Sequence, residues 1–143
     1  MFTNIEHIGI AVRDLAASSE LFATLLNRES YKSEEVASEG VLTAFFLVNQ
    51  TKIELLAATR PDSAIATFIE KRGEGTHHIA FEVDDIVAEM ARLKEAGFTL
   101  LNEVPKRGAD NKLVCFVHPK TANGVLVELC QEMKRVQGST SKV

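Results

Sequence analysis

Two histidines and two glutamates recur at matching places in the two halves of this chain. His7 opens the segment HIGIAVRD, and His78 opens the similar segment HIAFEVDD. Glu54 lies in KIELL and Glu128 in LVELC, each at nearly the same distance after the histidine of its half. Imidazole and carboxylate together suit a divalent ion such as Co²⁺, Zn²⁺, Ni²⁺ or Mn²⁺ and leave open coordination positions. If the two halves pack about a pseudo-twofold axis, these side chains predict one shared metal site.

The alternation of residues along a β-strand predicts on which face these four side chains lie. Neighbouring residues point to opposite faces, so His7 and Gly9 share one face while Ile8 points to the other. The same rule puts Glu54 and Glu128 opposite the apolar residues that flank them. The four polar side chains are therefore expected on one concave face, where glycine and alanine neighbours leave open space.

The remaining histidines and the cations give less specific predictions than the four residues above. His77 has the opposite strand parity from the histidine that follows it, and Glu6 takes its place in the first half, so we expect His77 to be structural. Cations of the central helix and of the second half could neutralise phosphates of a ligand. The same residues would also be expected if these cations were simply solvated loop residues. These candidate substrate-binding residues are Arg72, Lys112 and Lys120.

Each histidine-led strand precedes a helix and three more strands, which predicts a tandem duplication of a β-α-β-β-β unit. Apolar residues at helical spacing follow Asp14 and the pair Asp84–Asp85, which can cap the two helices. A third helix, at about 62–72 with Asp62 or Ser63 as cap, lies between the copies. The later strands are expected at about 30–37, 41–48 and 51–56 in the first copy and at about 98–101, 113–118 and 125–130 in the second.

This duplication predicts an α+β fold in which two βαβββ modules form one curved mixed sheet around the metal site. The expected single domain spans residues 1–132, with module 1 at about 4–58, a linker helix at about 61–73 and module 2 at about 76–132. Residues 133–143 are expected to form a polar C-terminal tail.

The composition excludes several classes of function. Of the 143 residues, 45% are hydrophobic, so the chain can build a core, and its net charge of −4 without a long basic stretch argues against nucleic-acid binding. No apolar run reaches the ~20 residues of a membrane helix, and a signal-peptide pattern is absent. Two cysteines do not make a disulfide framework. We therefore expect a soluble, cytoplasmic protein without nucleic-acid or membrane partners.

The duplicated unit with one histidine and one glutamate in each half resembles the vicinal oxygen chelate superfamily, which includes glyoxalase I and extradiol dioxygenases. Within that superfamily, the chain resembles the methylmalonyl-CoA epimerase family. The resemblance covers about residues 4–132, and its segments are EHIGIAV (6–12), TKIELL (51–56), PDSAIATFIEKRGEGTHHIAFEVDDI (61–86) and HPKTANGVLVELC (118–130). It implies a homodimer that binds an acyl-CoA thioester.

The resemblance further implies an isomerase that interconverts (2R)- and (2S)-methylmalonyl-CoA by removing the α-proton through a metal-stabilised enolate. The residues on the metal-ligand positions of the family are His7, Glu54, His78 and Glu128, and cobalt is the first candidate metal. Glu128 also falls on the position of a catalytic base, and Glu54 is the candidate for the opposite face of the enolate. Some relatives carry a second glutamate base where this chain has Thr43, which leaves the second base open.

Two alternative functions fit the same ligand pattern. A glyoxalase I-type lactoylglutathione lyase uses the same His/Glu/His/Glu set, but the closing turn HPKTANG (118–124) resembles the epimerases rather than the Asp-Pro-Asp-Gly turn common in glyoxalases. A non-catalytic binding module of the resistance-protein kind often lacks one or more of these ligands, whereas all four are present here.

Overall fold

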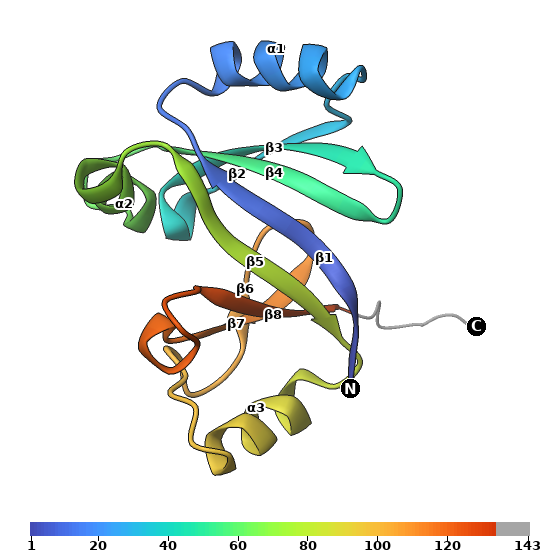
Figure 1. Ribbon diagram of the computed structural model, residues 1–143, viewed down its shortest axis with the longest axis vertical. Coiled ribbons are helices and arrows are strands. Elements are labelled where there is room, and N and C mark those ends of the chain that lie inside the picture. Colours follow the sequence, from blue (N-terminus) through green and yellow to red (C-terminus); the bar gives the residue numbers. More distant parts are fainter. Residues whose placement is uncertain (134–143) are drawn as a thin grey trace.

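The computed structural model describes residues 1–133 as two similar runs of strands and helices (Figure 1). The first run contains β1 (Phe2–Ala11), α1 (Leu15–Leu26), β2 (Lys32–Val36), the 3₁₀ turn Ala37–Glu39, β3 (Val41–Val48) and β4 (Thr51–Ala58). After α2 (Ala64–Arg72), the second run contains β5 (Gly75–Val83), α3 (Ile86–Glu95), β6 (Lys106–Arg107), β7 (Lys112–Val117), the 3₁₀ turn Pro119–Thr121 and β8 (Val127–Glu132). The predicted β-α-β-β-β order of each half is confirmed, while the predicted tail lies, from residue 134 onward, outside the described residues.

The eight strands of the described residues form one mixed sheet in the order β2-β3-β4-β1-β5-β8-β7-β6. β1 runs parallel to β4, β5 runs parallel to β8, and the two halves join through the antiparallel pair β1–β5. Figure 1 shows β1 and β5 crossing the middle of the molecule, with β3–β4 on one side and β7–β8 on the other. This arrangement confirms the predicted α+β class and places the histidine-bearing strands of the two copies next to each other.

Helix α1 covers the outer side of the first half. It begins after Asp14, whose side chain accepts a hydrogen bond from the backbone N–H of Ala17 (3.0 Å), and it ends at Asn27 in the left-handed conformation. The apolar side of α1 packs against Phe46 and Leu55, which are fully buried. The predicted cap of this helix, Asp14, is confirmed.

Helices α3 and α2 complete the packing. α3 is capped by Asp85 and buries Ile86 against Leu129, at the opposite end of the molecule from α1 (Figure 1). α2 is capped by Ser63 and buries Ile65 against β1 and β4. Within residues 1–133, no helix has both the length and the apolar character that crossing a membrane requires.

One predicted strand of the second half is corrected by the structure. Residues 98–101 contribute an isolated bridge between Leu100 and Val117, and the strand that pairs with β7 at this edge is the two-residue β6. The reason lies in the following residues. The side chain of Asn102, rather than its backbone, accepts a hydrogen bond from Phe116 N (3.2 Å), and Pro105 has no N–H to donate to a strand ladder.

Candidate metal centre

Strand β1 contains one extra residue directly before its predicted ligand histidine. Along the β1–β5 pair, Ile5 lies opposite Phe81 and His7 lies opposite Ala80. Two steps on β1 therefore match one step on β5, so Glu6 forms a β-bulge. Because of this bulge, Glu6 and His7 are adjacent in the chain and yet both line the same cavity.

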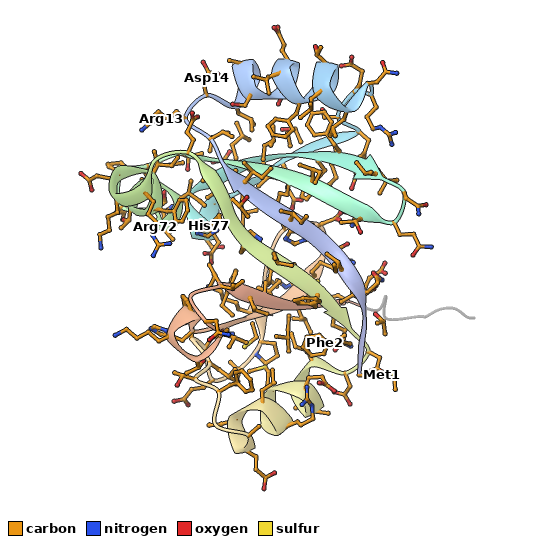
Figure 2. The ribbon with its side chains drawn as sticks, viewed as in Figure 1. Met1, Phe2, Arg13, Asp14, Arg72 and His77 are labelled. Carbon is orange, nitrogen blue, oxygen red and sulfur yellow. The ribbon has the colours of Figure 1, made fainter. Side chains whose placement is uncertain are left out.

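Strand β5 contains the corresponding bulge at His77. Gly9 lies opposite His78 and Ile10 lies opposite Thr76, which leaves His77 as the extra residue. His77 and His78 therefore both line the cavity, and Figure 2 shows His77 beside α2. Strand alternation predicted that His77 faces the side of the sheet opposite to His78. This prediction was wrong, because a bulge interrupts the alternation.

Each predicted ligand glutamate approaches a ligand histidine across a small residue of the strand between them. Glu54 of β4 lies beside Gly9, which in turn lies beside His78 of β5. The pseudo-symmetric row has the same order of a glutamate, a small residue and a histidine, and it consists of Glu128, Ala80 and His7. The missing side chain of Gly9 and the single methyl group of Ala80 leave room for the larger side chains to converge.

The four predicted ligand side chains meet in one buried cluster, in which each is 6% exposed or less. The Nε2 atoms of His7 and His78 lie 3.0 Å apart. His7 Nε2 is 3.1 Å from Glu54 Oε1 and 3.4 Å from Glu128 Oε1. His78 Nε2 is 3.0 Å from Glu128 Oε1 and 3.9 Å from Glu54 Oε1.

These separations fit a shared divalent metal ion. Ligand atoms around a tetrahedral ion with bonds of 2.0–2.1 Å are about 3.3 Å apart. Nitrogen and oxygen atoms of His7, Glu54 and His78 all lie within 4.8 Å of one another, and Glu128 contacts both histidines. The structure thus brings together the four residues that the sequence singled out, and their role as metal ligands stays a prediction.

The electrostatics of the cluster also favour a cation. Burial raises the pKa of the Glu54 carboxyl. Burial likewise opposes ionisation of Glu128, but hydrogen bonds from His7 and His78 outweigh it and lower the pKa of Glu128 to about 2. Burial lowers the pKa of His7, yet hydrogen bonds to Glu128 and Glu6 raise it to about 10. In the metal-free protein a proton on His7 therefore balances the buried carboxylates, and a divalent cation would replace it.

Behind His7 lies a group of charged residues whose link to the cluster the sequence analysis missed. Glu6 Oε1 accepts a hydrogen bond from His7 Nδ1 (2.7 Å), and Glu6 Oε2 accepts one from Lys52 Nζ (2.5 Å). Lys52 also donates to Asp110 Oδ2 (2.5 Å), and Lys32 donates to Asp110 Oδ1 (2.7 Å). Glu6 would have been found only by predicting the bulge, since regular alternation turns it away from His7.

His77 holds the corresponding place behind His78. The Nδ1 atoms of the two rings lie 2.9 Å apart, and the His77 ring packs edge-on against Phe68 of α2, with 4.8 Å between ring centroids. Burial lowers the pKa of His77 to about 4, with a further contribution from the nearby charge of His78. His77 is therefore neutral and can accept a hydrogen bond from its neighbour.

The cluster lines a cavity of about 280 Å³ between the two halves of the sheet. Its walls are largely apolar and include Val41, Phe45, Leu56, Ile65, Val114 and Phe116. Lys106 and Arg107 of β6 also line the cavity. Apolar walls around a few convergent polar groups are typical of a small-molecule site.

The three cations that the sequence suggested for substrate binding lie in different places. Lys112 is buried and lines the cavity, with its Nζ 3.7 Å from Glu6 Oε2. Arg72 ends α2 (Figure 2), and Lys120 lies in the turn Pro119–Thr121. Both are exposed, and neither is among the residues that line the cavity in the described part of the chain. The structure therefore does not bring Arg72 and Lys120 to the cluster, and their substrate-binding role stays a prediction.

Thr43, where some epimerases carry a glutamate, is fully buried and lines the cavity. Its hydroxyl donates a hydrogen bond to the backbone carbonyl of Glu34 (3.0 Å). A threonine hydroxyl is not a base at neutral pH. Of the carboxylates in the cluster, Glu54 comes from the same half of the chain as Thr43.

Replacing Gly9 by alanine is expected to damage the site without unfolding the protein. A Cβ atom at position 9 would collide with the imidazole ring of His78 and would push it out of the cluster. Because a misplacement of ~1 Å can cost on the order of 10²-fold in rate, we expect a loss of that size in activity together with weaker metal binding. Metal titration and thermal unfolding of Gly9→Ala measure both effects, and a variant with unchanged affinity would contradict the packing argument.

Comparison with known proteins identifies the family. Residues 6–116 match the model of the glyoxalase/bleomycin resistance protein/dioxygenase superfamily. This chain therefore belongs to that superfamily, whose fold the curved eight-stranded sheet also shows.

Within the superfamily, the chain is similar over nearly its whole length to methylmalonyl-CoA epimerases. It is 44% identical to the ethylmalonyl-CoA/methylmalonyl-CoA epimerase of Cereibacter sphaeroides, over 92% of this chain and 99% of the relative. It is 39% identical to the human mitochondrial methylmalonyl-CoA epimerase, over 89% of this chain and 73% of the relative. A variant of Streptomyces coelicolor methylmalonyl-CoA epimerase, solved in complex with 2-nitronate-propionyl-CoA, superimposes with a TM-score of 0.90 at 36% identity, covering 92% of this chain and 96% of that one. The resemblance predicted from the sequence is confirmed.

Proposed function

We propose that this protein is a metal-dependent epimerase that interconverts (2R)- and (2S)-methylmalonyl-CoA. The observation that carries the proposal is the buried convergence of two histidines and two glutamates, one pair from each half, in a chain similar to methylmalonyl-CoA epimerases. The complex of the Streptomyces coelicolor enzyme with a CoA ligand supports an acyl-CoA thioester as the substrate class.

The residues that would hold the metal ion are His7, Glu54, His78 and Glu128. A bound divalent ion would supply Lewis-acid stabilisation for the negative charge that develops when the α-proton leaves. This α-proton lies between a thioester and a carboxylate, so its removal gives an enolate that needs such stabilisation. Cobalt is our first candidate, and zinc, nickel and manganese suit the same nitrogen and oxygen ligands.

The two glutamates are suited to proton transfer on opposite faces of a planar enolate. Glu128 comes from β8 and Glu54 from β4, on opposite sides of the central pair β1–β5. We assign removal of the proton on one face to Glu128. Glu54, or a water molecule beside it, serves the other face. Epimerisation requires this division, because a proton must leave one face and return on the other.

The walls of the cavity would hold the rest of the substrate. Apolar residues from both halves keep water away from the enolate, which would otherwise be protonated without control of the face. Lys106 and Arg107 line the cavity on β6 and could face the phosphates of a coenzyme A group. Lys112, Lys120 and Arg72 remain further candidates for this role.

Deuterium wash-in tests the proposal directly. Metal-loaded protein is mixed in D₂O with a single epimer of methylmalonyl-CoA, and mass spectrometry follows label uptake while chiral analysis follows the epimer ratio. We expect label to enter as the ratio approaches one, and we expect a chelator to stop both changes. Stable stereochemistry without label uptake would overturn the proposed function.

A parallel assay with the glutathione–methylglyoxal hemithioacetal separates the epimerase from the alternative lactoylglutathione lyase. Both reactions move a proton next to a carbonyl group, so the same four ligands could serve either. Rapid formation of S-lactoylglutathione without epimerisation would transfer the assignment to the lyase. The homodimer and the cytoplasmic location stay predictions from the sequence.

A further inference from the structure

Two of the bulges in the central strands place one extra side chain behind each histidine of the cluster. Glu6 precedes His7 on β1, and His77 precedes His78 on β5. The positions are equivalent under the pseudo-twofold relation of the two halves, but the residues are not: one is a carboxylate and the other an imidazole. The two histidines therefore receive different partners at their Nδ1 atoms.

Glu6 is held firmly behind His7. The side chain is 6% exposed, and its two oxygens have different partners: Oε1 lies 2.7 Å from His7 Nδ1, and Oε2 lies 2.5 Å from Lys52 Nζ. Lys112 Nζ lies 3.7 Å from the same Oε2. Lys52 is itself fixed by Asp110, whose Oδ2 lies 2.5 Å from its Nζ. An ordered carboxylate between two cations can only accept a hydrogen bond, so His7 Nδ1 must carry the proton.

This contact sets the orientation and the electronic character of His7. With one proton held on Nδ1, loss of the other ring proton on metal binding would leave the lone pair of Nε2 pointing into the cluster, where Nε2 lies 3.0 Å from His78 Nε2. A carboxylate partner also makes the imidazole a stronger donor to a metal than a neutral partner does. His78 has an imidazole, that of His77, at its Nδ1 in place of a carboxylate.

We propose that Glu6 is a positioning residue that fixes His7 as the stronger of two unequal histidine ligands, with Lys52 anchoring Glu6 in place. The proposal rests on the proposed function in that a divalent metal ion is the ligand of the cluster. Glu6 touches neither the substrate nor the reacting atoms and acts through His7.

Metal affinity of Glu6→Gln tests the proposal. Glutamine keeps the size of the side chain but loses the charge, and loss of such a partner typically lowers metal affinity by about 10–100-fold. We expect a loss in this range for Co²⁺ or Zn²⁺ in a competition titration against a chelator, and partial recovery in Glu6→Asp. Glu34→Gln is the matched control. Glu34 belongs to the same group of charged residues as Lys32 and Asp110, with its Oε1 3.5 Å from Lys32 Nζ, and it contacts no histidine. We expect it to bind metal as the wild type does.

The hydrogen bond itself can be observed without measuring activity. In the zinc-loaded wild type, NMR should show a strongly downfield, slowly exchanging Nδ1 proton on His7, and this resonance should move upfield or disappear in Glu6→Gln. Unchanged affinity together with an unchanged resonance overturns the proposal. If Glu6→Gln does not fold, the variant Lys52→Met replaces it, because this change removes the anchor of Glu6 without touching His7. A weaker metal affinity of Lys52→Met supports the proposal, and a wild-type metal affinity overturns it. A wild type that binds zinc but lacks epimerase activity contradicts the proposed function and leaves both of these readouts intact.

Discussion

Glutamine in place of Glu128 is expected to abolish epimerisation while leaving the fold intact. The variant loses a base, and general acid–base catalysis contributes about 10²–10⁴-fold to rates of this kind. It also loses one of the two carboxylates of the cluster, so the expected loss lies at the upper end of that range or beyond. Deuterium wash-in from each epimer separately measures the effect and shows which face Glu128 serves.

The matched control for this variant is Glu132→Gln. Glu132 lies on the same strand β8 but is exposed at its end, and in the described part of the chain it does not itself line the cavity. We expect its rates to match those of the wild type. Glu54→Gln provides the complementary measurement, because its defect should appear on the opposite face of the enolate. A Glu128→Gln enzyme that retains activity within tenfold of wild type would remove Glu128 from the mechanism.

Metal removal is expected to have an effect as large, and one that can be reversed. Dialysis against a chelator should eliminate epimerase activity, and added Co²⁺ should restore it, because the metal ion would supply the main stabilisation of the negative charge on the enolate. His78→Ala should be inactive and should not respond to added metal, since it lacks a nitrogen that lies 3.0 Å from both His7 Nε2 and Glu128 Oε1.

The control for His78→Ala is His118→Ala. His118 caps the turn Pro119–Thr121, with its Nδ1 accepting a hydrogen bond from Lys120 N (3.0 Å), and it does not line the cavity within residues 1–133. Its replacement should leave both activity and metal response unchanged. Full activity of the chelated wild type would contradict the assigned role of the four-residue cluster.

The sequence predicted the four-residue cluster because duplication makes the pattern visible. A histidine or glutamate on a strand says little alone, but His7 and His78, and likewise Glu54 and Glu128, occupy equivalent places in two copies. Strand alternation then placed all four on one face, and in the structure they meet there. Helix ends were predictable for the same local reason, since a capping side chain such as Asp14 acts within one turn.

The residues that support the cluster could not be predicted from local patterns. The bulges at Glu6 and His77 arise in the pairing of β1 with β5, two strands from different halves, so no short segment contains the information. Lys52 reaches Glu6 from the neighbouring strand β4, and Asp110 reaches Lys52 from the loop between β6 and β7, whose path depends on the whole fold. The exposed positions of Arg72, at the end of a helix, and of Lys120, in a turn, could not be predicted either, because charge alone does not say where such a side chain points.

The division of the four-residue cluster between the two halves of the chain has a consequence for the stability and lifetime of the protein. Each half supplies one histidine and one glutamate, and the seam between them is the antiparallel pair β1–β5. An ion bound across that seam would act as a reversible cross-link, worth about 2.7 kcal/mol when free metal is a hundredfold above its dissociation constant. In metal-poor surroundings the seam would open more often and expose its strands to proteases. The supply of one ion would then govern not only turnover of substrate but also the lifetime of the protein.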